Sequence, residues 1–308
     1  MSSPPKKILV TTATGSQGSG VVRHCLRAGH HVYALTRTPS SPAALALSAL
    51  GATLVTGDAS SPASLAAATR GMDAVFINAL PDFQPLPNAE TRAVAAAVAA
   101  AQASGTVSTV FYTSVAKTGQ HESFPGWGNA HDDDDDDPMR NYWLSKHANE
   151  ELVRAAGFAH WTILRPTVFL QDLEMPKSGW MFPGLEETGV LKAAFGPGAV
   201  LDLCDAADVG GFVAAALAEP GRFDGREIAV AAERVTPVEL VERVNRVRSR
   251  KIVFENYTEE EMEVVGKTPV VRAQCWLNEV GYDVDVEALK EYGVKLTTIE
   301  EYFSKAEN

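Results

Sequence analysis

A tyrosine and a lysine four residues apart, Tyr142 and Lys146, are the side chains of this sequence best suited to acid–base chemistry. At this spacing both lie on one face of a helix. A lysine ammonium beside a phenol favours the phenolate and lowers the tyrosine pKa, and such a tyrosine can protonate a developing alkoxide. Chance pairing on a helix is the alternative, although Tyr142-Trp-Leu-Ser-Lys146 is the only Tyr-x-x-x-Lys segment of the chain.

These two residues need a sheet and a turn to place them beside a substrate. Ile8–Val10 is an apolar run of strand length, and Thr12-Ala-Thr-Gly15-Ser-Gln-Gly18 follows it directly. Apolar residues at helical spacing come next, and Val32–Leu35 reads as a second buried strand. A βαβ unit with glycines at its first turn is typical of dinucleotide binding, and the lysine would then reach ribose hydroxyls.

Within this turn, glycines and free amides suit a pyrophosphate group. Gly15 allows close approach of the backbone, and Gly18 allows the helix to pack near the strand. The amides of Ser16, Gln17 and Gly18 face the phosphates at the positive end of the helix. The pattern Gly-x-x-Gly-x-x-Gly has glycine where Thr12 stands, but these amides come later, so we expect binding to survive. A turn that binds nothing is the alternative.

Arg37 follows the second strand, at the position where an NAD site usually has Asp or Glu. Its planar guanidinium suits the 2′-phosphate of NADP, which predicts NADP(H) as cofactor. A solvated surface arginine is the alternative. Asp58 ends the third strand, where it either accepts a hydrogen bond from adenine or caps its own loop.

Strands and helices alternate through the first half of the chain. Further strands are expected at 53–56, 73–78, 108–114 and 161–165, with helices at 40–50, from 61, at 88–103 and at 138–156. This alternation predicts an α/β fold with a doubly wound parallel sheet, in which ligands bind at the carboxyl ends of the strands. Thr113-Ser114 lies at such an end, where a hydroxyl could hold a substrate oxygen.

The pattern changes after Pro166. Residues to about 195 are rich in Pro, Gly, Met and aromatic side chains, which would serve either the core of a smaller lobe or a cleft for an apolar ligand. Residues 202–218 read as a helix with Asp205 as N-cap, 226–230 as a strand, 237–247 as an amphipathic helix and 252–254 as a short strand. We expect residues 1–165, completed by 200–232, to form a cofactor-binding domain. Segments 166–199 and 233–308 would form a smaller C-terminal substrate lobe.

Composition limits the class of protein. The hydrophobic fraction of 45% and the charged fraction of 21% are ordinary for a globular chain of 308 residues. The net charge is −12 and argues against nucleic acid or an anionic membrane as partner. Three widely spaced cysteines and the absence of a signal-peptide core or a long apolar run predict a cytoplasmic protein without a membrane span.

An uninterrupted acidic run, Asp132–Asp137, supplies six of the negative charges. A solvated, self-repelling loop whose last aspartate caps the helix opened by Pro138 is favoured over a metal site, because nothing fixes six adjacent carboxylates around one ion. No histidine has metal-ligand spacing, so no metal is expected.

Taken together, these motifs make the chain resemble the NmrA-like branch of the atypical short-chain dehydrogenase/reductases. The likeness covers nearly all residues and includes the turn 12–18, Ala-Leu-Thr-Arg37, Gly57-Asp58, Tyr142–Lys146, Leu164–Phe169 and Leu201–Gly210. It implies a Rossmann-type NADP-binding domain with substrate under the C-terminal lobe.

The resemblance also implies roles for individual residues. Ser114, Tyr142 and Lys146 would form the catalytic trio, with Thr113 as the alternative to Ser114, and Arg165-Pro166 would lead into the nicotinamide side of the cleft. The expected cofactor-binding residues are Thr12, Thr14, Gly15, Ser16, Gln17, Gly18, Arg37, Asp58, Asn78, Lys146 and Pro166. The expected substrate-binding residues are Phe169, Met175, Trp180 and Phe182.

Two functions remain open at this point. The first is an NADPH-dependent reductase of a small apolar carbonyl, quinone or conjugated aromatic substrate, as in secondary metabolism, with a monomer or homodimer as the assembly. The second is a non-catalytic NADP(H)-sensing regulatory protein of the NmrA type that acts through a protein partner. Because regulatory members of this family have often lost the tyrosine, Tyr142 favours the enzyme.

Overall fold

The computed structural model describes residues 4–127 and 137–306, and its centre is a seven-stranded sheet. The sheet has the order β10-β6-β5-β4-β1-β2-β3, and every pairing in it is parallel. The chain changes direction across the sheet between β3 and β4, so the predicted doubly wound parallel sheet is confirmed. The strands are β1 (Lys7–Val10), β2 (His31–Thr36), β3 (Thr53–Thr56), β4 (Ala74–Ile77), β5 (Thr109–Thr113), β6 (His160–Pro166) and β10 (Arg226–Val230).

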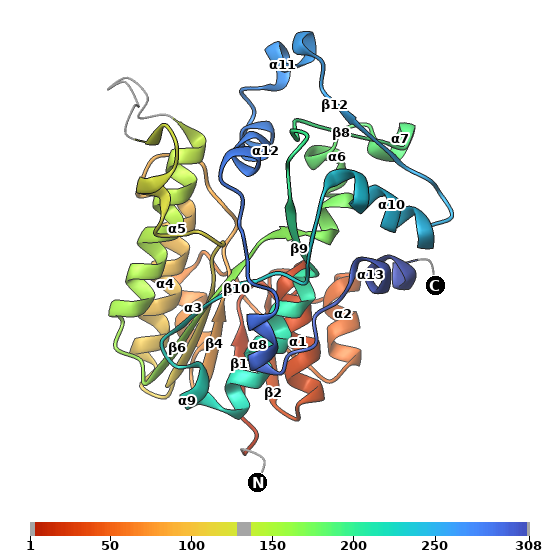
Figure 1. Ribbon diagram of the computed structural model, residues 1–308. Helices are drawn as coiled ribbons and strands as arrows, with labels where there is room; N and C mark the ends of the chain where they lie inside the picture. Colours follow the sequence, from red (N-terminus) through yellow and green to blue (C-terminus); the bar gives the residue numbers. More distant parts are fainter. Residues whose placement is uncertain (1–3, 128–136, 307–308) are drawn as a thin grey trace.

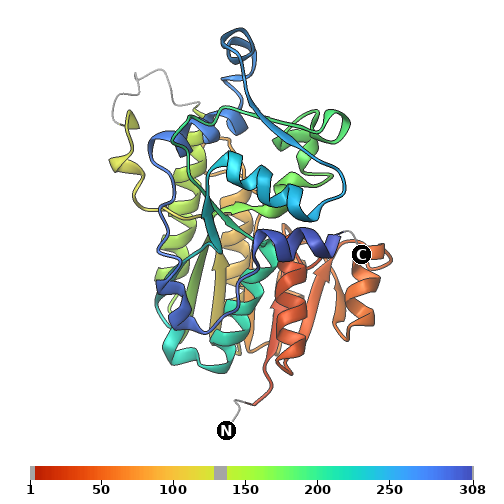
Figure 2. The same cartoon turned by 45° about the vertical axis from the view of Figure 1, so that its right-hand side comes forward.

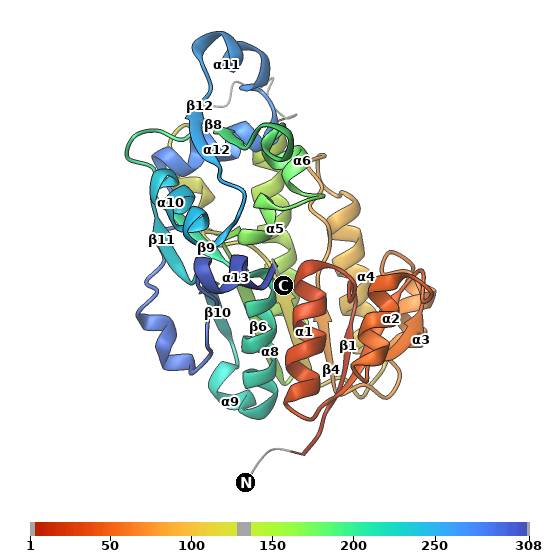
Figure 3. The same ribbon diagram turned by 90° about the vertical axis from the view of Figure 1, so that its right-hand side faces the viewer.

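Each face of the sheet has its own helical layer, because successive strand residues point to opposite sides. Ile8 and Val10 pack on one side with α1 and α8, while Leu9 packs on the other with α3 and α4. Figures 1 and 3 show α4 and α5 on one side of the sheet, with α1 and α8 opposite. The helices of these layers are α1 (Ser16–Arg27), α2 (Pro42–Ala49), α3 (Pro62–Ala68), α4 (Ala89–Ala103), α5 (Pro138–Ala155), α8 (Val209–Ala218) and α9 (Pro220–Phe223).

Helices α1 and α8 touch through glycine backbone. A Cβ atom on Gly20 would lie 2.4 Å from the Cα of Ala207, and one on Gly210 would lie 2.5 Å from the carbonyl group of Gly20. Larger side chains would push the helices apart. This contact fixes the start of α1, and therefore the glycine turn, against the segment that enters α8.

A smaller lobe covers the carboxyl ends of the strands (Figure 1). It contains two short sheets, one of β7 (Val168–Phe169), β9 (Leu201–Cys204) and β11 (Glu233–Val235), the other of β8 (Val190–Ala193) and β12 (Val253–Asn256). Its helices are α6 (Ser178–Met181), α7 (Leu185–Thr188), α10 (Pro237–Val247), α11 (Glu259–Val265), α12 (Pro269–Glu279) and α13 (Ile299–Ala306), with the 3₁₀ turn η3 (Leu170–Leu173). The 3₁₀ turns η4 (Ala206–Asp208) and η5 (Ala288–Tyr292) pack instead on α1 and on the sheet core.

The prediction of a helix from Asp202 is wrong at its start. Residues 201–204 form β9, which pairs with β7 and β11, and the helix begins only after Asp205. The carboxylate of Asp205 accepts a hydrogen bond from the amide of Ala207, as the N-cap assignment requires. A four-residue strand in a small sheet has too few residues to show a period, which is why the sequence pattern merged it with the helix.

The C-terminal segment does not stay within the lobe. Residues between Tyr282 and Leu296 pack against the core beneath α1 and α8, and Thr297 donates two hydrogen bonds to the carboxylate of Asp208. Only α13 then returns to pack on α10, and Figure 2 shows it between α10 and the start of α1. Part of the segment that sequence assigns to the lobe therefore ties the lobe to the sheet. No helix within the described ranges is long and apolar enough to cross a membrane.

Candidate functional site

The glycine turn lies at the carboxyl end of β1 and opens α1. Gly15 is the N-cap residue, and no side chain caps this helix end. A Cβ atom on Gly18 would lie 2.1 Å from the carbonyl oxygen of Thr12, so only glycine allows this close packing, as predicted. The hydroxyl of Thr12 is buried without a hydrogen-bond partner among the described residues. An uncapped helix start beside an unpaired buried hydroxyl fits a bound phosphate group.

At the ends of β1, β4 and β5, neighbouring polar groups are already paired. Thr11 Oγ1 donates to the carbonyl of Asn78 (3.3 Å) and accepts from its amide (3.2 Å). The hydroxyl of Thr113 donates to Gln17 Oε1 at 2.6 Å, which joins β5 to the glycine turn. The predicted cofactor residues Gln17 and Asn78 therefore lie at the switch point of the sheet.

Beside the end of β2, Arg37 is exposed and Asp58 is engaged locally. The Asp58 carboxylate accepts hydrogen bonds from the amide and the hydroxyl of Ser60, each at 2.8 Å. These bonds, with a smaller contribution from the nearby Arg37, lower the pKa of Asp58. Asp58 thus acts as the loop cap that the sequence left as an alternative, and Arg37 remains available to an anion.

Tyr142 and Lys146 lie on α5 as the spacing predicts, with the lysine Nζ 5.5 Å from the centre of the phenol ring. Lys146 is almost fully buried, and its ammonium forms an ion pair of 2.8 Å with the carboxylate of Glu90. Burial of the phenol holds the pKa of Tyr142 well above its usual value, and nearby Tyr282 and Glu90 raise it further. The expectation of a lowered tyrosine pKa is therefore wrong, because burial of the phenol is the largest influence and raises the pKa.

Glu90 is a site residue that the sequence analysis missed. It lies in the first turn of α4, where an acidic residue ordinarily complements the helix dipole and attracts no attention. Its link to Lys146 spans 56 positions along the chain and depends on the packing of α4 against α5. No local spacing could have indicated this contact.

Ser114, the third member of the expected trio, is buried, and its hydroxyl pairs with Thr118 Oγ1 at 3.2 Å. Its amide donates to the carbonyl of Leu164. Within the described residues no hydrogen bond joins Ser114 to Tyr142, so its role stays a prediction. Thr113, the alternative, is the one bonded to the glycine turn.

The residues expected to contact substrate separate into two groups. Phe182 is only 5% exposed and belongs to the lobe core, the alternative that the sequence left open. Phe169 packs against the sheet core, with Lys177 Nζ 5.1 Å from its ring. Met175 and Trp180 are 61% and 59% exposed. Contact of Phe169, Met175 or Trp180 with a substrate remains a prediction.

Aromatic side chains from distant segments gather around Tyr142. Its ring stacks on Phe83 at 5.6 Å, and Trp143, the next residue, packs on Trp276 of α12 at 5.0 Å. Tyr282 packs on Trp276 in turn. The indole nitrogen of Trp276 is buried and has no hydrogen-bond partner among the described residues. This cluster gives the surroundings of Tyr142 an apolar character that sequence order did not reveal.

Arg165 and Pro166 are held by the protein itself. The guanidinium of Arg165 binds the buried carboxylate of Glu150 through two nitrogens and also contacts Glu227. The carbonyl of Pro166 accepts a hydrogen bond from the amide of Ala116. Pro166 lies at the end of β6, as predicted. The guanidinium of Arg165 forms ion pairs with Glu150 and Glu227 of the protein itself.

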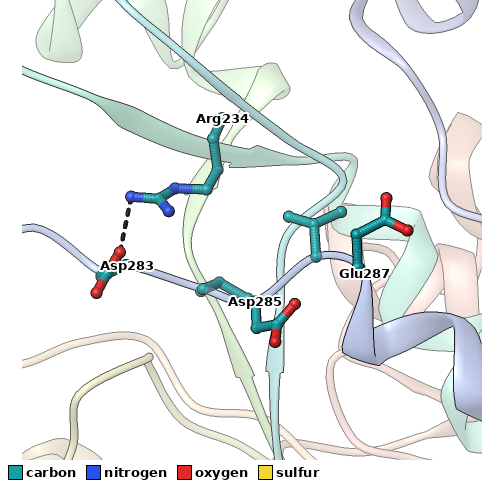
Figure 4. Close-up of a pocket in the computed structure, with 6 residues that line it drawn as sticks. Arg234, Asp283, Asp285 and Glu287 are labelled. Carbon is teal, nitrogen blue, oxygen red and sulfur yellow. Dashed lines mark ion pairs between the residues drawn. The ribbon is translucent and has the colours of Figure 1, made fainter.

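The hollow shown in Figure 4 is lined by none of the predicted site residues. Its volume is about 410 Å³, and Arg234 faces Asp283 across it at 2.9 Å, with Asp285 and Glu287 alongside. This acidic rim lies between β11 and the C-terminal segment, where Asp283 directly follows Tyr282 of the aromatic cluster.

For the acidic run, only Asp137 lies among the described residues; the prediction of a loop at Asp132–Asp136 concerns residues outside them. The carboxylate of Asp137 accepts from the amide of Met139 at 2.8 Å, which confirms it as the cap of α5, and it also binds Arg272. Across residues 4–127 and 137–306, no group of three or more His, Cys, Asp or Glu side chains could hold a metal ion.

Comparison with known proteins bears on the whole chain. The (4-alkanoyl-5-oxo-2,5-dihydrofuran-3-yl)methyl phosphate reductase of Streptomyces griseus is 31% identical over 251 residues, which cover 80% of this chain and 76% of that protein. A model of the NmrA-like family matches residues 4–303.

Two solved structures share the fold at 21% identity, each covering 98% of this chain. The NADPH-dependent quinone oxidoreductase of Escherichia coli, complexed with NADPH, has a TM-score of 0.71 and is covered over 100% of its length. NmrA, a negative transcriptional regulator in complex with NADP, has a TM-score of 0.70 and is covered over 95%. The match over 4–303 confirms the resemblance seen in the motifs: the chain belongs to the NmrA-like family.

Proposed function

We propose that the protein is an NADP(H)-dependent reductase of a small apolar carbonyl, quinone or conjugated aromatic compound, of the short-chain dehydrogenase/reductase type, with Tyr142 as general acid. The observation that carries this proposal is the uncapped glycine turn after β1, with its unpaired Thr12 hydroxyl. Tyr142, stacked on Phe83, lies in the first turns of α5, the helix that follows β5 in the same sheet. The reductase from Streptomyces griseus, to which the chain is 31% identical, supports the reaction class.

The cofactor is NADPH rather than NADH. Arg37 is exposed next to the end of β2, at the position where an NAD site usually has Asp or Glu, and Asp58 nearby is bonded to Ser60 through its Oδ1. The first-turn amides of α1 bind the pyrophosphate, and Lys146 binds ribose hydroxyls with donors that Glu90 leaves unused. When bound, NADPH supplies a hydride.

Tyr142 donates the proton that completes the reduction. A phenol is protonated at neutral pH already at its ordinary pKa of about 10, and the raised pKa keeps it so, which means the proton is present when an oxyanion develops. The same shift makes the phenol a weaker acid than an ordinary tyrosine. It therefore gives up its proton readily only to a strong base, such as the alkoxide formed from a reduced ketone. The anion of a reduced quinone is itself a phenolate and needs this proton less, because an ordinary tyrosine has a pKa of about 10.

The alternative is a non-catalytic NADP(H)-sensing regulator that acts through a protein partner. It is supported by the solved structure of NmrA, a negative transcriptional regulator in complex with NADP. Thr12 at the first turn position also departs from the glycine pattern of the enzymes. Both functions need the cofactor, so cofactor binding alone does not separate them.

The test is NADPH oxidation by the purified protein with a panel of quinones and aryl ketones, combined with NADPH binding followed by fluorescence. A reductase binds NADPH and oxidises it with at least one member of the panel. Binding without turnover on every member, together with an NADPH-dependent protein interaction, would favour the regulator.

A further inference from the structure

The ion pair between Glu90 and Lys146 is closed off from solvent on both sides. The exposed fractions of the two side chains are 0% and 5%, and Nζ lies 2.8 Å from Oε1. Breaking such a pair by removing one partner costs far more than breaking a surface pair, because the remaining charge stays buried. The position of the Lys146 ammonium therefore depends on the Glu90 carboxylate.

The carboxylate of Glu90 is itself fixed by neighbours from two elements. Asn149, one turn after Lys146 on α5, donates to Oε1 at 3.3 Å and to the Tyr112 hydroxyl at 3.2 Å. The amide of Asp82 donates to Oε2 at 3.3 Å. Lysine has three N–H donors, and Glu90 takes one of them, so the other two keep defined directions.

The charged and titratable groups that face Tyr142 come from five parts of the chain. Lys146 on α5 lies at its ring, and Glu90 on α4 raises its pKa. Asp172 of η3, paired with Lys177 at 3.4 Å, and Tyr282 of the C-terminal segment act in the same direction, and Tyr112 on β5 adjoins from the sheet side. Lys146 is thus the cation closest to the phenol, and Glu90 is the anion that balances it.

We propose that Glu90 is a positioning residue for Tyr142 and Lys146: its carboxylate holds the lysine ammonium in place and cancels its charge at the phenol. The consequence is a tyrosine that stays protonated, rather than one activated as a phenolate by its lysine. This inference rests on the proposed function for its catalytic meaning, but its test does not need turnover.

The test is a pH titration of tyrosinate absorbance in the cofactor-free protein. Each variant is measured with and without Tyr142→Phe, and the difference isolates the ionisation of Tyr142. Glu90→Gln removes a negative charge and leaves the lysine unbalanced, and both changes favour the phenolate. The Tyr142 step should move down by about one to three pH units, the range for a nearby opposite charge.

Two variants serve as controls. Glu90→Asp keeps the charge and should give a step close to that of the wild type. Glu150→Gln removes another fully buried carboxylate, which lies two turns after Tyr142 on α5 and is paired with Arg154 and Arg165. It should leave the Tyr142 step unchanged. A Glu90→Gln step at the wild-type pH, or an equal shift in Glu150→Gln, would overturn the proposal.

If Glu90→Gln does not fold, the double variant Glu90→Gln/Lys146→Met carries the test, because it strands no charge. It should fold where Glu90→Gln does not. A double variant that also fails to fold would contradict a direct link between the two side chains. If the wild-type protein oxidises no NADPH while Glu90→Gln still shifts the Tyr142 step, only the proposed function is contradicted. The two failures are therefore distinguishable.

Discussion

Two buried carboxylates form ion pairs at helix α5, Glu150 of α5 itself and Glu90 of α4, and they differ in how many cationic donors they bind. Near the C-terminal end of α5, Glu150 is bound by Arg154 and by two nitrogens of Arg165, and both arginines also contact Glu227. Nearer the start of α5, Glu90 meets a single lysine. In the first network the guanidinium groups donate to carboxylates of the protein. In the second, Glu90 binds one N–H donor of Lys146, and the other donors of the lysine lie near the aromatic cluster.

Under the proposed function, this difference distinguishes an ion-pair network that only stabilises the fold from an ion pair that also binds the cofactor. A saturated network can hold β6, β10 and α5 together, but it offers nothing to a ligand. An ion pair with spare donors at the ligand end of a sheet can hold a cofactor and still keep its geometry. Burial alone would rank the two sites equally, since Glu90 and Glu150 are both fully buried.

The largest effect should come from Lys146→Met, which changes stability and function together. It leaves Glu90 buried without its cation, so the free energy of unfolding should fall by about 3–5 kcal/mol. The lost charged hydrogen bond should weaken NADPH binding by about tenfold or more, with lower turnover. Denaturant unfolding and fluorescence titration measure both. Unchanged NADPH affinity would remove Lys146 from the cofactor site.

Glu150→Gln should lower the free energy of unfolding by less, about 1–3 kcal/mol, because Arg154 and Arg165 keep their ion pairs with Glu227. The NADPH affinity of the folded protein should stay at the wild-type value. The same two measurements apply. A loss of affinity as large as that of Lys146→Met would erase the distinction between the two sites.

Arg37→Ala should weaken NADPH binding by about ten- to a hundredfold, because a hydrogen bond to a charged group contributes roughly 1.5–3 kcal/mol. NADH binding should barely change. Arg70→Ala, at an exposed arginine beyond α3, serves as the matched control and should alter neither. Equal losses for both cofactors in Arg37→Ala would show that Arg37 does not read the 2′-phosphate.

The smallest effect concerns the start of α5. Asp137→Ala removes the cap of this helix and should lower the free energy of unfolding by about 0.5–2 kcal/mol. Asp137→Asn restores a cap but not the ion pair with Arg272, which is partly exposed and should contribute at most about 1 kcal/mol. An Asn variant as unstable as the Ala variant would assign the whole effect to Arg272.

Local patterns predicted the parts of the molecule that depend on neighbours in sequence. The glycine turn, the parallel sheet and the shared face of Tyr142 and Lys146 follow from spacing, and the structure has all three. The direction of the tyrosine pKa shift was mispredicted because it depends first on burial of the phenol, and then on Tyr282 and Glu90, which segments distant in the sequence bring to it. Short strands such as β9 were missed because four residues show no period.

The central claim is that Tyr142 donates the proton in an NADPH-dependent reduction, and its most direct test is the turnover of Tyr142→Phe beside the wild type. The change removes one hydroxyl and little volume, so folding and NADPH affinity should persist. Turnover on an aryl ketone should fall by about 10²–10⁴-fold, the usual contribution of a general acid, with a smaller loss on a quinone. Undiminished turnover on both substrates in a variant that still binds NADPH would contradict the claim.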